Sequence, residues 1–200
     1  MSPHPTRRKF LQVASVGSVA LAGCLGGSDS PQSTTDSGGD QTQPTDSATG
    51  ESGGSNIDSA WFTSELTDVN SGETFTVEGL LDRPILLETF AVWCSNCLRQ
   101  QKELITFHEM LGDEVTTVAL DIDPNEDAQL VREHTEKHGF DWRYAISPGS
   151  VTQSLVDEFG SSMASPPVVP MLLICPDGSV TRLKDGHKTT GFLREYISQC

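Results

Sequence analysis

Residues 91–99 read AVWCSNCLR, in which Cys94 and Cys97 stand two residues apart and Trp93 directly precedes the first cysteine. This spacing fits a redox-active disulfide, half of a metal site or a structural crosslink. The flanking sequence and the rest of the chain have to decide among the three.

The cysteine pair stands between a predicted strand and a predicted helix. Residues 84–91 (PILLETFA) form a near-continuous apolar run, which is typical of a strand covered on both faces. Residues 98–111 carry apolar side chains at helical spacing and end before Gly112. Cys94 therefore falls at the N-terminus of a helix, where unpaired N–H groups and the helix dipole favour a thiolate and lower its pKa. Cys97 follows one turn later, within reach to resolve a mixed disulfide.

The remainder of the chain alternates between strand-like and helix-like segments, after a hairpin predicted within the extended residues 61–77. Residues 165–170 (SPPVVP) are predicted not to be helical. We expect strands at 115–122, 142–146, 171–175 and 179–183, and helices at 125–138, 151–159 and 189–198. This alternation predicts an α/β sandwich with a mixed sheet.

At these residues the chain resembles the thioredoxin superfamily, and the resemblance extends over nearly all of residues 60–199. It implies a three-layer sandwich with a mixed central sheet. The family's buried acid, six residues before the first cysteine, corresponds to Glu88, which would relay a proton. The family's cis-proline corresponds to Pro170, so that Val169 and Pro170 would dock the substrate backbone beside the disulfide. The alternative for Glu88 is an edge position or an ion pair with Lys102 or Arg83.

Two departures from plain thioredoxin narrow the resemblance. The leading hairpin and a helix and strand inserted at residues 124–160 are similar to the membrane-anchored TlpA/ResA-like reductases. The dipeptide Ser95-Asn96 replaces the familiar Gly-Pro and would tune the redox potential, which leaves the direction of electron flow open. Trp93 is expected to pack beside the sulfurs and act as a lid.

Metal binding is the main alternative for the cysteine pair. Zinc would need His134 and His138, which lie on a polar helix expected to face solvent. A gap of 36 residues separates Cys97 from His134, too long for a compact zinc finger. A copper chaperone of the Sco type shares the fold, but that family spaces its cysteines by three and adds a downstream histidine. His187 is expected to be a bystander. We therefore expect no metal and no cofactor besides the Cys94–Cys97 disulfide.

Two more cysteines lie in the C-terminal part. Cys175 ends a predicted buried strand, where a free cysteine behaves as a small apolar residue. In the thioredoxin fold that strand and the closing helix both run away from the active-site end. Cys175 and Cys200 are then placed to form a structural disulfide, and both alternatives stay open.

The N-terminal residues predict export and lipidation. Arg7 and Arg8 precede a 13-residue apolar stretch, too short to span a bilayer, and resemble a twin-arginine signal. Residues 21–24 (LAGC) resemble a lipobox, in which Cys24 becomes the lipidated first residue. We expect a signal peptide at 1–23, a lipidated Cys24 with a disordered tether over 24–56, and a folded domain at 57–200.

The charge balance limits the classes of partner. Without the three basic residues of the signal segment, 10 basic residues face 28 acidic ones, a net charge of −18. Nucleic acid would be repelled. Acidic, lysine-poor lipoproteins of this kind resemble those of halophilic archaea, where high salt screens self-repulsion.

Together these patterns predict an extracytoplasmic thiol–disulfide oxidoreductase anchored to the cell membrane by Cys24. Its expected partners are the thiols and disulfides of client proteins and a membrane electron donor. The copper chaperone is the alternative function.

Overall fold

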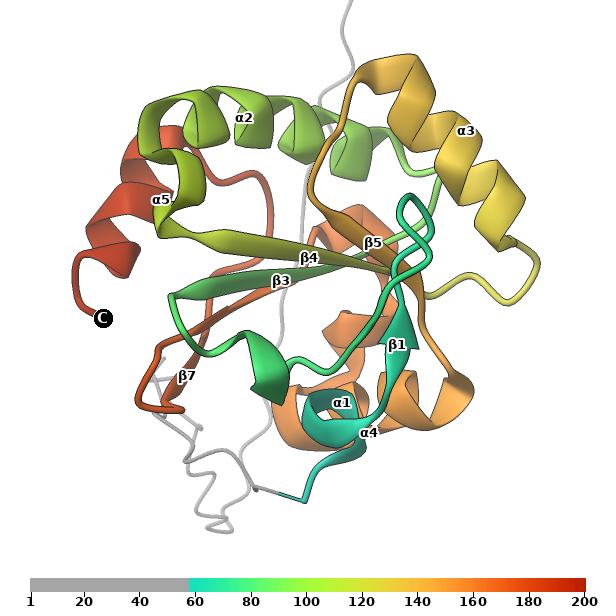
Figure 1. The fold of residues 1–200 in the computed structure, drawn as a ribbon, viewed down its shortest axis with the longest axis horizontal. Helices are drawn as coiled ribbons and strands as arrows, with labels where there is room; N and C mark the ends of the chain where they lie inside the picture. Colours follow the sequence, from blue (N-terminus) through green and yellow to red (C-terminus); the bar gives the residue numbers. More distant parts are fainter. Residues whose placement is uncertain (1–57) are drawn as a thin grey trace, which may run out of the picture. The chain divides into compact units, whose positions relative to one another are not determined.

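A mixed five-stranded sheet forms the centre of the computed structural model, which describes residues 58–200 (Figure 1). The predicted signal peptide, Cys24 and the tether lie outside the described residues. The sheet has the order β5-β4-β3-β6-β7, in which β4 runs parallel to β3 and β5, while β6 runs antiparallel to β3 and β7. Its strands are β3 (Ile85–Phe90), β4 (Thr116–Asp121), β5 (Arg143–Ile146), β6 (Met171–Ile174) and β7 (Val180–Arg182).

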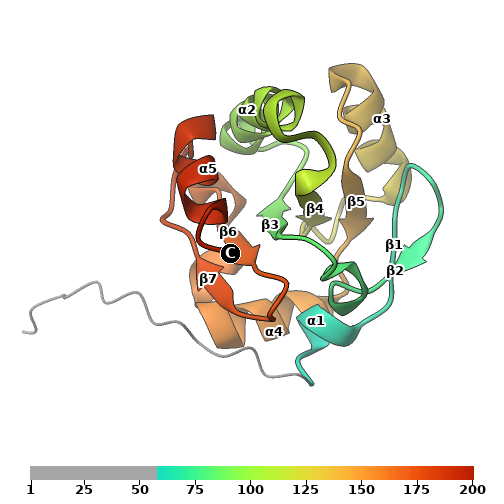
Figure 2. The same ribbon diagram turned by 60° about the vertical axis from the view of Figure 1, so that its left-hand side comes forward.

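Helices cover both faces of this sheet, which confirms the predicted three-layer α/β sandwich (Figures 1 and 2). One face carries α2 (Ser95–Leu111), α3 (Ala128–His138) and α5 (Thr190–Ile197). The other carries α1 (Ala60–Thr63) and α4 (Gly149–Phe159). No helix among residues 58–200 is long and apolar enough to cross a membrane.

Strand β3 is buried along its whole length, as its apolar run predicted. Because side chains alternate across a strand, Leu86 and Phe90 join the core beneath α2, whereas Ile85 and Leu87 join the core beneath α1 and α4. Each fully buried leucine or isoleucine contributes about 2 kcal/mol of hydrophobic stabilisation. Glu88 shares the parity of Leu86 and Phe90, so it lies on the α2 face.

The segment inserted between β4 and β6 adds one edge strand and two helices. Helix α3 starts at the N-cap Asp127, whose side chain accepts from the N–H of Leu130, and ends at Gly139, which has a φ of 72°. A left-handed residue at a helix end favours glycine, as the sequence predicted. Strand β5 then pairs with β4 at the edge of the sheet.

The predicted hairpin is present but separate from the main sheet. Strands β1 (Leu66–Thr67) and β2 (Thr74–Phe75) pair antiparallel in a two-stranded sheet of their own. The expectation of an extended Trp61 is wrong, because Trp61 lies in α1, fully buried, with its indole N–H donating to Glu158 on α4. Tertiary packing against α4 stabilises a four-residue helix that sequence propensity does not predict.

The proline-rich segment before β6 also differs from its expected form. We expected no helical structure, yet Pro166–Val168 forms one 3-10 turn. Proline is accepted at the first positions of a helical turn because its missing N–H needs no partner there. The turn ends at Val169, whose φ of 53° is left-handed.

Candidate active site

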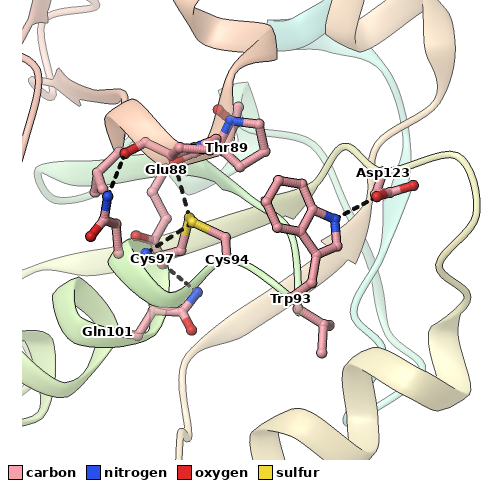
Figure 3. The surroundings of a disulfide bond; sticks show 12 residues. Glu88, Thr89, Trp93, Cys94, Cys97, Gln101 and Asp123 are labelled. Carbon is pink, nitrogen blue, oxygen red and sulfur yellow. Dashed lines mark hydrogen bonds between the residues drawn. A yellow bond between two sulfur atoms is a disulfide. The ribbon is translucent and has the colours of Figure 1, made fainter.

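The Cys94–Cys97 disulfide is located at the N-terminus of α2, directly after β3 (Figure 3). Cys94 is the N-cap residue with an extended backbone, and its sulfur accepts the N–H of Cys97 at 3.1 Å. After reduction, the same N–H and the positive end of the helix dipole stabilise a Cys94 thiolate. The predicted placement of the pair at a helix start is confirmed.

The 3-10 turn of residues 166–168 packs over the disulfide. Only 2% of Cys94 and 1% of Cys97 is exposed to solvent. The Cys97 sulfur lies 3.1 Å from the carbonyl oxygen of Pro166, and the Asn96 side-chain amide donates to the carbonyl of Pro167 at 2.9 Å. In the reduced protein a Cys97 thiol is therefore placed to donate to the Pro166 carbonyl, which keeps it protonated while Cys94 ionises.

Glu88 lies in the layer beneath α2, as the alternation along β3 requires. It is fully buried, and this burial raises the pKa of its carboxyl to about 7. Its Oε1 accepts a hydrogen bond of 3.0 Å from the Gln101 amide, and the ammonium of Lys188 also favours the ionised form. In Figure 3 the disulfide lies between Trp93 on one side and Glu88 and Gln101 on the other. A carboxyl that titrates near neutral pH can exchange a proton at working pH.

The two expected ion-pair partners of Glu88 do not contact it. Arg83 is half-buried and pairs with its neighbour Asp82 at 2.6 Å. Lys102 is exposed on α2. Glu88 is instead an interior residue of the central strand of the sheet, which excludes the edge position as well.

Lys188 is a site residue that the sequence analysis missed. Although it is a lysine, it is fully buried, and its ammonium donates to the carbonyls of Val169 and Gly186. Burial lowers its pKa to about 8, against the opposing attraction of Glu88. Its backbone N–H and carbonyl are both bonded by the side-chain amide of Gln100, another fully buried residue of α2. A lone lysine before a helix start carries no sequence signal of burial.

Val169 and Pro170 lie beside the disulfide turn, at the start of β6. Val169 is buried, and it is the one non-glycine residue with a positive φ among residues 58–200. A β-branched residue in this conformation is strained by about 1–3 kcal/mol. Its N–H donates to the carbonyl of Pro166 at 2.8 Å, and its carbonyl accepts from Lys188. Both polar groups predicted to dock a substrate backbone are thus bonded within the domain, so docking at Val169 stays a prediction.

Trp93 is the most exposed large apolar side chain beside the disulfide. Trp93 is 59% exposed, and its indole N–H donates to Asp123 at 2.6 Å. The preceding residue, Val92, is held in a similar way, because its N–H donates to the Glu126 carboxylate at 2.7 Å. The loop between β4 and α3 therefore holds the residues before Cys94 in place while leaving the indole face open to solvent.

The expectation that His134 faces solvent is wrong. His134 is only 6% exposed, and its Nε2 lies 2.8 Å from the Gln101 side-chain oxygen. Burial, with the nearby His138 and Lys137, lowers its pKa to about 4.

His187 does not join His134 and His138, and its Nε2 lies 3.9 Å from the Glu103 carboxylate. Within residues 58–200, no three histidine, cysteine or acidic side chains gather into a group able to hold a metal ion.

The second cysteine pair forms a disulfide at the opposite end of the sheet. Cys175 and Cys200 are bonded with their Cα atoms 5.2 Å apart. Cys175 follows Ile174, which pairs with Ile85 at the start of β3, whereas Cys94 follows the end of that strand. The crosslink attaches the C-terminus to the sheet, and the predicted pairing is confirmed over the free-cysteine alternative.

Comparisons with known proteins place this fold. Neither a protein-family model nor a curated protein matches the chain. A thioredoxin-family thiol:disulfide interchange protein from Chlorobium tepidum TLS superposes with a TM-score of 0.57 at 14% identity, covering 68% of this chain and 90% of that one. A secreted Mycobacterium tuberculosis disulfide oxidoreductase, described as homologous to E. coli DsbE, superposes with a TM-score of 0.54 at 16% identity. The superposition covers 68% of this chain and 95% of that one. A thioredoxin-like protein from Aeropyrum pernix has a TM-score of 0.52 at 19% identity, and the superposition covers 68% of this chain and 88% of that one. At these identities the comparisons establish the fold: residues 58–200 form a thioredoxin-like domain with a CxxC disulfide at the N-terminus of α2.

Proposed function

We propose that the protein is an extracytoplasmic thiol–disulfide oxidoreductase that reduces disulfides of exported proteins. The observation that carries the proposal is the Cys94–Cys97 disulfide at the N-terminus of α2, in the layer that also holds the buried carboxyl of Glu88. The similar folds of solved thiol:disulfide interchange proteins support it.

In the proposed reaction the reduced protein transfers two electrons to a client disulfide; one of the two protons of the product thiols comes from Cys97 and the other from solvent. The Cys94 thiolate attacks one client sulfur, which forms a mixed disulfide and releases the other sulfur as a thiolate that takes up a proton. Cys97 loses its proton to ionised Glu88 and attacks the Cys94 sulfur, which re-forms the Cys94–Cys97 disulfide and releases the second client sulfur as a thiolate. This thiolate takes up a proton as Glu88 gives its own proton up. A dithiol donor restores the reduced protein by the same exchange.

The N-terminal sequence supports a location at the outer face of the membrane. In this proposal the twin-arginine segment exports the chain, lipidated Cys24 anchors it, and the tether lets the domain move between a membrane electron donor and its clients. The acidic composition would keep the domain soluble at high salt.

The test is turnover of model disulfides by the purified domain. Wild type should accelerate insulin reduction by dithiothreitol, Cys94→Ser should abolish this activity, and Cys97→Ser should accumulate mixed disulfides. The double variant Cys175→Ser/Cys200→Ser is the matched control and should stay active. A wild-type protein that neither reduces nor oxidises any model substrate contradicts the proposal. Tight retention of Cu(I), lost on His187→Ala, would favour the copper chaperone.

The reduction potential of the Cys94–Cys97 pair decides the direction of electron flow. A value near −270 mV, as in thioredoxin, supports the proposed reductase. A value near −120 mV, as in a strong oxidant, contradicts the reductase and assigns the opposite direction. Exchanging Ser95-Asn96 for Gly-Pro tests whether this dipeptide sets the value.

A further inference from the structure

A chain of three buried side chains extends from the proposed proton acceptor to the inserted helix α3. Gln101 donates from its amide nitrogen to Glu88 Oε1 at 3.0 Å, and its amide oxygen lies 2.8 Å from Nε2 of His134. All three side chains are buried. They come from β3, α2 and α3, so the contact exists only in the folded domain.

The polarity of this chain follows from hydrogen-bond inventory alone. The Gln101 oxygen can only accept, so His134 must carry its proton on Nε2 in this arrangement. The Gln101 nitrogen then can only donate, so Glu88 Oε1 must accept. The reversed amide would place its oxygen against Glu88, which requires a protonated carboxyl, and would require a bare Nε2 on His134. Each tautomer of His134 therefore selects one orientation of the Gln101 amide.

The second oxygen of Glu88 is the one that can take up a proton. Glu88 Oε2 is buried, with no hydrogen-bond partner in the described part of the chain. Because Oε1 is occupied by the Gln101 N–H, a proton taken up by Glu88 belongs on Oε2.

We infer that His134 and Gln101 are positioning residues, which orient Glu88 so that Oε1 stays an acceptor and Oε2 carries the proton that Glu88 takes up. The inference rests on the proposed function, and it gives the inserted segment a role in the chemistry. Neither side chain is hydrogen-bonded to the sulfur of Cys94 or Cys97 in the described residues, so both act through Glu88.

The other titratable groups near Glu88 and His134 do not link the two residues. Glu88 also faces the ammonium of Lys188, from the loop before α5, and the phenol of Tyr144 on β5. Around His134, the titratable neighbours His138 and Lys137 both belong to its own helix, and Phe90 of β3 stacks on the imidazole with ring centroids 6.0 Å apart. Among these groups, only Gln101 is hydrogen-bonded to both Glu88 and His134.

The test compares His134→Phe with His134→Gln, by titrating the Glu88 carboxyl carbon with NMR in the oxidised protein. Phenylalanine keeps the ring but removes the donor, so the amide is free to reverse and accept from a protonated Glu88. We expect the midpoint to rise by about half to one pH unit. Glutamine places an N–H near the position of Nε2, and we expect it to restore the wild-type midpoint. His138→Gln is the matched control on the same helix and should leave the midpoint unchanged.

Three results would overturn the inference: an unchanged midpoint in folded His134→Phe, an equal shift in His134→Gln, or an equal shift in His138→Gln. Nitrogen NMR of wild-type His134 provides a check that needs no variant, since a proton on Nδ1 at neutral pH contradicts the proposed polarity. These titrations use oxidised protein without a client. An inactive protein with the expected shifts would thus refute the proposed function and leave the positioning intact.

Discussion

The ammonium of Lys188 donates a hydrogen bond of 2.5 Å to the carbonyl of Val169, which ties the loop before α5 to the segment beside the disulfide. The same ammonium lies close enough to Glu88 to oppose the rise in the pKa of its carboxyl. One buried cation thus acts on both the strained backbone and the buried acid.

Removing this cation should shift the titration of Glu88. In Lys188→Met the carboxylate loses an attracting charge, so we expect the pKa of Glu88 to move above 7. Carbon NMR of the oxidised protein measures the midpoint. Lys102→Met, which removes an exposed cation from α2, serves as the control and should leave the midpoint near 7. Equal midpoints in the two variants would show that Lys188 exerts no such field.

Glu88 should make the stability of the oxidised domain depend on pH. Folding raises its pKa from 4.5 to about 7, so between these values the folded state binds more protons than the unfolded state. Its contribution to stability is complete below pH 4.5 and is lost as the pH rises through 7. Relative to Glu88→Gln, the wild-type free energy of unfolding should fall by on the order of 3 kcal/mol over this range.

Urea denaturation of both proteins at a series of pH values measures this difference. The pKa of Asp121 is also raised to about 7 by burial, but Asp121 is present in both proteins and cancels in the comparison. Stability curves that run parallel from pH 4.5 to 8 would mean that Glu88 is not the group responsible.

Trp93 should contribute to client binding and little to folding, because more than half of the residue is exposed. We expect Trp93→Ala to raise KM for an insulin-like substrate by about fivefold, as the loss of one aromatic contact implies, with kcat little changed. The melting temperature should stay within a few degrees. Met110→Ala, at an exposed apolar residue of the same protein, is the control; a matching rise in KM there would discount a specific contact.

The Cys175–Cys200 disulfide should stabilise the domain without taking part in turnover. Its closed loop spans a sequence separation of 25 residues, for which removal of the crosslink costs about 3 kcal/mol. Cys175→Ser/Cys200→Ser should lose this amount in urea denaturation while insulin reduction persists. Thiol counting by mass in wild type provides the direct check, since a single disulfide's worth of released thiols would disprove the crosslink.

Much of the fold was predictable because its signals are local. The apolar run of β3, the helical spacing of α2 and the stop at Gly112 each depend on neighbours in the chain, and the structure follows them closely. The short elements were not predictable from the sequence. Trp61 is helical only because α4 covers it, and the 3-10 turn at Pro166 depends on packing against residues distant in the sequence.

The sequence by itself determined the reactive pair, its place at a helix N-terminus, and the register that puts Glu88 on the α2 face of β3. These follow from spacing and from the two periodicities of helix and strand. Only the tertiary structure decided which polar side chains were buried against that acid. Lys188 and His134 look like surface residues in the sequence, because the free energy of burying a polar group depends on partners supplied by distant elements, here Val169 and Gln101.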